Sequence, residues 1–146
     1  MATKLTIEII TPEKIIFSGS ADQITLPTAA GQITVLPNHV ALVSALASGE
    51  LIIKEGASET FMAVSDGLIQ VHPDRVRILT DTAERAEDID EARAEQAHRR
   101  AQDLMTEKKD DVDYTALTAK IEKELARLHV ARKRKHRATP EPHTDR

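Results

Sequence analysis

The chain has 146 residues, of which 40% are hydrophobic and 30% charged, and its formal net charge is −4. This length is typical of one or two small domains. The chain has no cysteine, which excludes disulfide scaffolds, cysteine-ligated metal centres and thiol catalysis. No apolar run approaches the roughly 20 residues that cross a bilayer, and the N-terminus lacks the pattern of a secretory signal. We therefore expect an intracellular, soluble protein.

The first part of the chain predicts β structure. Leu5, Ile7 and Ile9 alternate with polar residues, which is the two-residue period of a strand with one solvated face. The Asp66-Gly67 pair between two apolar runs indicates a tight turn. No helix-length pattern interrupts this part, so we expect a β sandwich or barrel and not alternating βαβ units. Further strands are predicted over residues 14–18, 22–26, 32–36, 40–46, 51–54, 60–64, 68–71 and 76–80.

The composition changes near Ala86. All five glycines lie at or before Gly67, whereas residues 74–139 contain neither Gly nor Pro. Their absence permits long helices. Residues 1–85 carry six basic and ten acidic side chains, a net charge of −4, and residues 86–146 carry 14 of each. The second part therefore differs from the first in both backbone preference and charge.

We expect this second part to form two helices in an antiparallel hairpin. Asp88 is predicted to cap the first helix, with Glu91 reaching back to the cap, and this helix should run to about Lys108. A polar break follows, in which Asp111 or Asp113 caps the second helix.

The apolar faces of the two helices are narrow, and alanine dominates the first. Small side chains bury little area each, so we expect the hairpin to detach at modest cost. Residues 136–146 contain two prolines and no apolar pattern, which predicts a disordered tail. The expected apolar positions are Ala94, Ala97, Ala101 and Leu104 in the first helix, and Tyr114, Leu117, Ile121, Leu125 and Leu128 in the second.

Candidate chemistry is sparse. The sequence contains none of the common nucleophile, phosphate-loop or zinc-protease motifs. His39 follows Pro37-Asn38 between two apolar runs, where an exposed turn residue is the simplest interpretation. Asp90 and Arg93 are three residues apart, which is typical of a surface ion pair on a helix. The interval from Arg127 to Arg137 holds six basic residues and no acid. It fits a solvated helix end, a contact with an acidic protein surface, or nucleic-acid binding, although no aromatic side chains interleave to stack bases.

Six stretches of the sequence stand out together, namely residues 5–19, 31–46 (GQITVLPNHVALVSAL), 67–71, 78–85 (ILTDTAER), 88–94 (DIDEARA) and 111–114. Their order and spacing resemble the epsilon subunit of bacterial F-type rotary ATP synthases. The resemblance covers about residues 3–130, and no single motif decides it.

The resemblance implies a ten-stranded β sandwich over residues 1–86 and a regulatory helical hairpin over residues 87–135. It implies a place in the central stalk of the rotor, where the sandwich binds the gamma subunit and the ring of c subunits. The residues implied to contact that ring are Gly31, His39 and Leu42.

The hairpin is implied to have two positions. Folded against the sandwich it permits turnover, and extended along gamma it reaches the alpha and beta subunits and blocks ATP hydrolysis. A small free-energy gap between such states lets a ligand shift their populations. The residues implied to make the inhibitory contact are Arg127, Arg132, Lys133, Arg134 and Lys135.

Some members of the family bind a regulatory ATP in the folded-down state, and their motif matches residues 89–94. Arginines would address the phosphates. Lys123 stands where the family has an arginine, and lysine lacks the planar fork. Carried over by position, the site would consist of Glu84, Asp90, Arg93, Arg100, Lys123 and Arg127.

The leading hypothesis is a noncatalytic rotor subunit of a proton-translocating ATP synthase, at the cytoplasmic face of the cell membrane and attached to it only through the complex. No cofactor is required, and ATP would be regulatory. The alternative is a free-standing ATP-sensing module, and a third class is an RNA-binding protein. The stretch of residues 31–46 favours the rotor subunit, because a free sensor needs no loop for docking on a ring. The lack of stacking aromatics speaks against nucleic acid as a partner.

Overall fold

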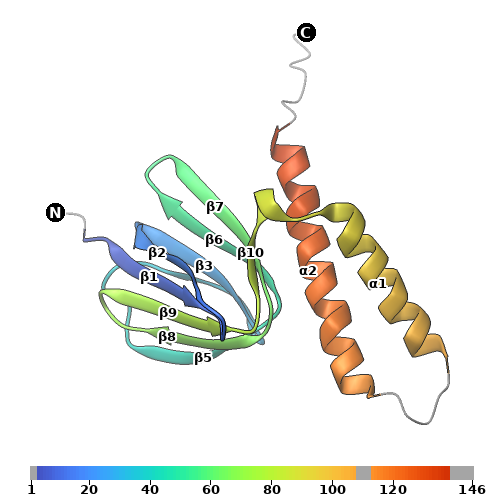
Figure 1. Cartoon of the computed structure of the whole chain (residues 1–146). Coiled ribbons are helices and arrows are strands. Elements are labelled where there is room, and N and C mark those ends of the chain that lie inside the picture. The colour runs from blue at the N-terminus through green and yellow to red at the C-terminus, as the bar shows by residue number, and fades with distance from the viewer. Residues whose placement is uncertain (1–2, 108–112, 139–146) are drawn as a thin grey trace, which may run out of the picture.

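Ten short strands form a β sandwich in the first part of the chain, in a computed structural model that describes residues 3–107 and 113–138 (Figure 1). Two helices follow, so the predicted fold class of a sandwich and a helical hairpin is confirmed. The strands are β1 (Leu5–Ile10), β2 (Ile15–Ala21), β3 (Gln23–Thr28), β4 (Gly31–Val35), β5 (Leu42–Leu46), β6 (Gly49–Glu55), β7 (Ser58–Val64), β8 (Gly67–Val71), β9 (Arg75–Thr80) and β10 (Ala83–Arg85).

The strands are hydrogen-bonded in the order β10-β7-β6-β3-β5-β8-β9-β1-β2, and β4 pairs with β3. Strand β3 belongs to both layers, because Gln23–Thr25 pair with β6 whereas Thr28 pairs with Leu46 of β5. All the pairs between the described strands are antiparallel except that of β1 with β9. Strand β1, near the N-terminus, is thus hydrogen-bonded to β9, one of the last strands in the chain.

An aliphatic core fills the space between the layers. Leu5, Ile7 and Ile9 are fully buried, which confirms the predicted alternation in β1. Full burial of such a side chain contributes about 1.5–3 kcal/mol. The sandwich therefore holds most of the hydrophobic stabilisation of the molecule. Other large side chains of this core are Ile24, Leu26, Val35, Leu51, Met62, Val64, Ile69, Val71 and Ile78.

Three details of the strand prediction are wrong. Strand β5 begins at Leu42 instead of Val40, because Asn38 adopts a positive φ of 65° and turns the chain there. The Asp66-Gly67 pair does not close a hairpin, since β7 and β8 pair with other strands and not with each other. Strand β10 was missing from the strands predicted by residue pattern, although the resemblance implied ten, because its three residues are too few to show a period.

The hairpin begins later than predicted. A short 3-10 helix, η1 (Ala86–Asp88), follows β10, and Ile89 is extended before helix α1 (Glu91–Thr106). The prediction that Asp88 is the cap is therefore wrong: Asp90 caps α1, and its carboxylate accepts a hydrogen bond from the Arg93 N–H at 3.1 Å. The first helix ends two residues before the predicted Lys108.

The start of helix α2 (Tyr114–Ala138) agrees with the sequence. The Asp113 carboxylate accepts hydrogen bonds from the backbone N–H groups of Thr115 and Ala116, at 3.1 and 3.2 Å. This confirms Asp113 as a cap, and Asp111 lies outside the described residues. Helix α2 continues through Ala138, so residues 136–138 are helical and not part of a disordered tail. The rest of the predicted tail lies outside the described residues.

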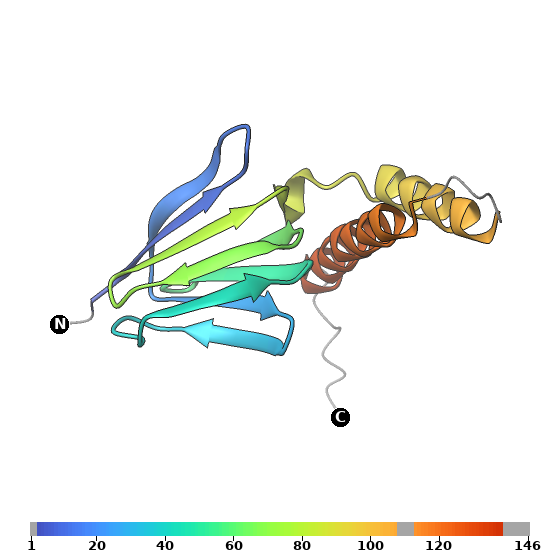
Figure 2. The ribbon, with the colours of Figure 1, turned by 90° about the horizontal axis from the view of Figure 1, so that it is seen from below.

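Helix α2 lies between the sandwich and α1, as two views at right angles show (Figures 1 and 2). It consequently buries two faces: Leu117 and Leu128 are buried, and so are Val130 and Ala131, which pack on the sandwich. The single apolar stripe predicted for each helix is therefore wrong in part. Ala94, Ala101, Leu117 and Leu128 are buried as expected, whereas Leu104, Tyr114 and Leu125 are 44–48% exposed.

No helix in the described part of the chain combines the length and apolar character needed to span a bilayer.

Candidate functional site

Helix α2 docks on the outer face of β6, β7 and β10. Strand pairing places Glu84, Ala63 and Glu50 side by side in one row across these three strands. The small Ala63 at the centre packs in one apolar cluster with Val130 and Ala131 of α2. A carboxylate lies on each side of that apolar contact, so the docking face combines a small apolar centre with two negative ends.

Arg127 of α2 pairs with the Glu84 end of this row. Its Nε donates to Glu84 Oε2 at 2.7 Å, its Nη2 to Glu84 Oε1 at 3.3 Å, and its Nη1 to Glu124 at 2.8 Å. Burial disfavours the charged guanidinium, but the hydrogen bonds with Glu84 and Glu124 outweigh burial and raise the pKa of Arg127. Arg127 is therefore a fixed cation that two carboxylates neutralise.

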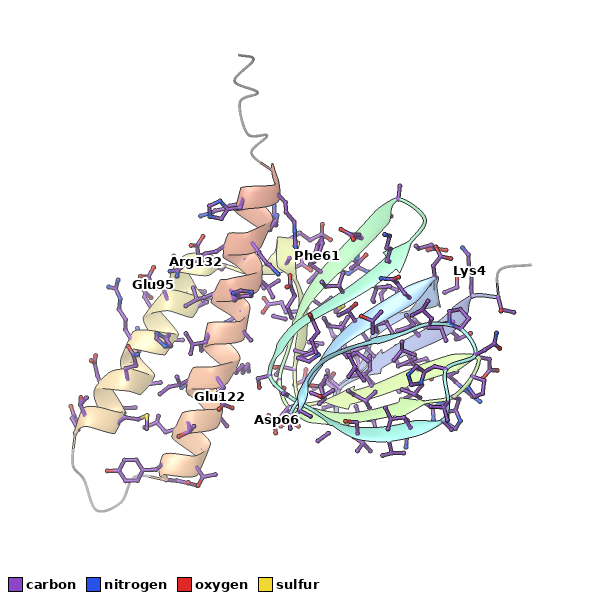
Figure 3. All side chains as sticks on the ribbon, turned by 180° about the vertical axis from the view of Figure 1, so that it is seen from behind. Lys4, Phe61, Asp66, Glu95, Glu122 and Arg132 are labelled. Atoms are coloured by element: carbon purple, nitrogen blue, oxygen red, sulfur yellow. The ribbon has the colours of Figure 1, made fainter. Side chains whose placement is uncertain are left out.

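Glu50 forms the other end of the row, and its side chain is only 6% exposed. Lys133 Nζ donates to Glu50 Oε2 at 2.6 Å, and Arg137 Nη1 donates to Oε1 at 3.5 Å. The Arg137 guanidinium carbon lies 3.5 Å from the centre of the Phe61 ring, which is a cation–π contact. Figure 3 shows Phe61 on the sandwich beside the C-terminal half of α2. We call Glu50, Phe61, Lys133 and Arg137 the Glu50 cluster.

Glu91 ties the start of α1 to the end of α2. Its carboxylate accepts hydrogen bonds from Lys135 and from Arg132 Nε, the latter at 3.3 Å. The hydrogen bond with Lys135 is the main cause that lowers the pKa of Glu91. Arg134 donates to the Ala86 carbonyl at 3.4 Å. Each of the five basic residues predicted to make the inhibitory contact thus has a partner within the folded chain.

The residues predicted for a nucleotide are only partly brought together. Arg93, Arg100 and Arg127 line one cleft of about 480 Å³ between the helices. Glu84 and Lys123 line a neighbouring cleft of about 320 Å³, which also includes Arg127. Asp90 lines neither cleft, because its carboxylate caps α1.

The first of these clefts has the chemistry of an anion site. Among the described residues, Arg93 and Arg100 have no ion-pair partner, so their guanidinium groups can address phosphate oxygens. Arg127 contributes less, because a phosphate would compete there with Glu84 and Glu124. Guanidinium groups gathered at one cleft are the chemistry that recognises anions such as phosphate.

The residues predicted to contact the ring of c subunits lie at two places. His39 lies in the turn between β4 and β5, and Leu42 begins β5. The Nδ1–H of His39 donates to the Val40 carbonyl at 2.7 Å in the corresponding tautomer. Gly31 begins β4 and has a positive φ of 117°, so it lies in the turn at the opposite end of that strand. The β4–β5 turn and the start of β5 carry exposed apolar side chains that sequence reasoning did not single out, namely Leu36, Val40 and Val43.

Sequence reasoning also missed Glu50, the acid of the sandwich that pairs with Lys133 and Arg137. Glu50 lies outside the predicted strand of residues 51–54, whereas β6 begins at Gly49. A signal was present, because Glu50 alternates with the core residues Leu51 and Ile53 and so belongs to the other face of its strand. That this face lies under a helix depends on the tertiary structure, which no local pattern reveals.

A β sandwich that carries a two-helix hairpin on a charged docking face defines the class of this protein. Residues 4–86 match the family model of the ATP synthase delta/epsilon chain β-sandwich domain, and residues 87–132 match that of its long α-helix domain. The chain therefore belongs to the ATP synthase delta/epsilon chain family. The resemblance to epsilon subunits found in the sequence is confirmed.

Curated relatives support this assignment over most of their length. The ATP synthase epsilon chain of Chloroflexus aggregans is 44% identical over 125 residues, which cover 86% of this chain and 90% of the relative. That of Halorhodospira halophila is 39% identical over 136 residues, covering 92% and 96%. That of Brevibacillus brevis is 39% identical over 131 residues, covering 89% and 99%.

Solved structures share the fold. A chain of the Euglena gracilis mitochondrial ATP synthase, in a structure of its OSCP, F1 and c-ring, has a TM-score of 0.72 at 24% identity. The match covers 84% of this chain and 79% of that one. A chain of the Tetrahymena thermophila mitochondrial ATP synthase central stalk and c-ring has a TM-score of 0.56 at 15% identity.

Proposed function

We propose that this chain is a noncatalytic subunit of the central stalk of a proton-translocating ATP synthase. The sandwich would anchor it to the rotor, and the hairpin would restrain ATP hydrolysis. The family match across both parts of the chain supports this proposal. The protein would then be peripheral, at the cytoplasmic face of the membrane, and attached only through the complex.

The sandwich offers a fitting anchor. Val40 is 75% exposed and Val43 66%, next to the turn that holds His39. Exposed apolar side chains gathered at one turn suit a protein partner better than water. The Asn38 N–H donates to the Pro73 carbonyl at 2.7 Å, which fixes the shape of this turn. We assign this end of the sandwich to the c-subunit ring, and we expect the gamma subunit to bind the sandwich as well.

The observation that carries the regulatory role is the composition of the docking face. Three of the five buried residues between hairpin and sandwich are alanines, namely Ala63, Ala86 and Ala131. Alanine buries little apolar area, so ion pairs provide much of what holds the hairpin in place. Undocking would release Arg127 from Glu84 and Lys133 from Glu50. Together with Arg132 and Lys135, which pair with Glu91 inside the hairpin, they could then face an acidic surface of the alpha and beta subunits.

A regulatory ATP is a second proposal, and the cleft lined by Arg93, Arg100 and Arg127 favours it. These arginines come from both helices of the folded-down hairpin, so a bound polyphosphate would bridge them and stabilise that position. Lys123 has no planar guanidinium group to bind phosphate through two hydrogen bonds, and the carboxylates of Glu84 and Glu124 already occupy that of Arg127. We therefore expect relief of inhibition to need high ATP concentrations.

The test measures ATPase activity of a head-and-stalk complex that lacks this subunit, after addition of the full chain. One variant combines Arg132→Gln, Lys133→Gln and Lys135→Gln. The matched control combines Lys4→Gln, Lys14→Gln and Lys54→Gln, which removes the same charge from the sandwich. We expect both variants to bind, and only the first to lose inhibition, because its cations can no longer pair with an acidic partner.

The same experiment also measures how inhibition of ATPase activity depends on salt and on ATP concentration. Inhibition by the unmodified chain should weaken as salt rises, since screening shortens electrostatic attraction to about 8–10 Å at physiological ionic strength. Added ATP should relieve it, and Arg93→Gln with Arg100→Gln should remove that relief. If the first variant inhibits as well as the control, the regulatory role is wrong. If neither protein binds the complex, the central-stalk assignment is wrong.

A further inference from the structure

The Glu50 cluster joins a nearly buried carboxylate on β6 to the last turns of α2. Burying a carboxylate is unfavourable unless cations pair with it, and both oxygens of Glu50 face cations of α2. Lys133 and Arg137 are four residues apart, so one face of the helix supplies both. The hairpin position and the burial of Glu50 therefore depend on each other.

The cations of the cluster differ from Glu50 in exposure. The side chain of Lys133 is 43% exposed and that of Arg137 is 37% exposed, against 6% for Glu50. When the hairpin leaves, Glu50 regains water and the cations lose little. The contact consequently remains open to competition from salt or from another acidic surface.

The Glu50 cluster holds a part of α2 that the apolar docking centre does not reach. The apolar residues of α2 in the docking centre are Val130 and Ala131, and the Glu50 cluster lies beyond them towards the C-terminal end. Because three of the five residues of that centre are alanines, it provides little area to hold the helix alone. Phe61 is only partly buried against the same centre, so the stacked Arg137 completes its cover.

We propose that the Glu50 cluster is the contact that fixes the C-terminal end of α2 on the sandwich, and that its opening is the step that frees Lys133 and Arg137. In the docked state Glu50 pairs with these cations, and in the undocked state an acidic protein surface would pair with them instead. The two partners then exclude each other, because Lys133 cannot pair with both. The first half of the proposal concerns the free chain alone, and the second half rests on the proposed function.

The experiment uses the full chain with two spin labels, at Ser58→Cys on the sandwich and Lys120→Cys on α2. The chain has no other cysteine, so the labels are unambiguous, and both positions are exposed. The distribution of distances between the labels gives the undocked fraction. The test variant is Glu50→Gln. The matched control is Glu55→Gln, on the same strand and with the same charge change, because Glu55 pairs at 2.7 Å with Lys4. Figure 3 shows Lys4 on the side of the sandwich away from the hairpin.

We expect Glu50→Gln to raise the ratio of undocked to docked molecules about tenfold, as for loss of one hydrogen-bonded charge pair. Glu55→Gln should leave the ratio unchanged. Added salt should raise the ratio in the unmodified chain and have less effect in Glu50→Gln. Equal ratios in Glu50→Gln and the unmodified chain, or an equal rise in the control, would overturn the proposal.

Two further measurements separate a local effect on docking from damage to the sandwich and from an error in the proposed function. Hydrogen exchange in β1 and β9 reports whether Glu50→Gln perturbs the sandwich itself. If it does, Lys133→Gln on the helix surface takes its place, with the same tenfold expectation and the same overturning result. ATPase inhibition is then measured with Glu50→Gln and Glu55→Gln, which keep all the basic residues assigned to the inhibitory contact. Undocking without any change in inhibition would uphold the Glu50 cluster and contradict the proposed role of the hairpin.

Discussion

Gly67 lies where the chain passes from β7 to β8, and its backbone touches that of β9. A Cβ atom at this position would lie 2.0 Å from the Leu79 carbonyl oxygen, well inside the distance at which atoms repel. Around it, the buried Ser65 and Thr80 hydroxyls lie 3.1 Å apart, and the Thr82 N–H donates to Ser65 Oγ at 2.9 Å. The glycine is required by close approach of two backbones and not by a turn.

Replacing this glycine should weaken the whole sandwich. We expect Gly67→Ala to lower the free energy of unfolding by about 3 kcal/mol, because the methyl group forces β8 and β9 apart. The control is Gly56→Ala. Gly56 has a φ of 59° and no atom within 4 Å of its added Cβ, so only the backbone strain of about 1–2 kcal/mol applies. Urea denaturation compares the two, and equal losses would contradict the assigned role of Gly67.

At the scale of the elements, the sequence pattern predicts the start of α1 to within a few residues but assigns the wrong cap. Asp88 and Glu91 have the spacing of a capping box, but the residues Ala86–Asp88 form η1, and Ile89 is buried at 9% exposure. Burial of Ile89 against Ala86 and Val130 draws the chain onto the sandwich before α1 begins. A tertiary contact has therefore overridden a local preference.

The two aspartates at this junction can be told apart by substitution. We expect Asp90→Ala to lower the free energy of unfolding by about 1 kcal/mol, because the Arg93 N–H loses its acceptor. Asp88→Ala removes the same charge next to the same helix and should cost little. Hydrogen exchange of the first turn of α1 measures both. A larger effect from Asp88 would restore the capping box that the sequence favours.

Much of the sandwich follows from its sequence, because burial of Leu5, Ile7 and Ile9 repeats with the period of the strand itself. The docking face does not follow in this way. Glu50, Ala63 and Glu84 come from three separate strands and meet only through pairing register. The arginines of the candidate nucleotide cleft came from the family resemblance, and periodicity alone would have described Arg93 as one partner of a surface ion pair.

At the scale of the whole molecule, ion pairs join a sandwich that has a large apolar core to a hairpin that has little apolar contact with it. The sandwich has a large aliphatic core, whereas its contact with the hairpin relies on Glu50 and Glu84. Within the hairpin, Glu91 joins α1 to α2. A carboxylate whose pKa is lowered in the folded state stabilises that state above its unfolded pKa. This contribution is lost as pH falls through the folded value.

Glu91 allows a direct test of this dependence. The Lys135 hydrogen bond lowers the pKa of Glu91, so we expect Glu91→Gln to be less stable than the unmodified chain at neutral pH. The difference in free energy of unfolding should stay constant down to about pH 4.3 and shrink below it. Glu95→Gln, whose carboxylate pairs with Arg99 on its own helix at 2.7 Å, is the control. A difference that persists unchanged at pH 2.5 would contradict the assigned role of the Glu91 pairs.

The parallel pairing of β1 with β9 has a consequence for how the protein is made. Residues Thr6–Ile10 align with Arg75–Leu79, so the first strand cannot find its partner until some 80 residues have left the ribosome. Contacts so distant in sequence form slowly. Until then β1 has only β2 beside it, and its other edge is open to unwanted strand pairing. Strand β10 follows within a few residues of β9, so the sandwich closes and its docking face is completed almost together, before the hairpin has emerged from the ribosome.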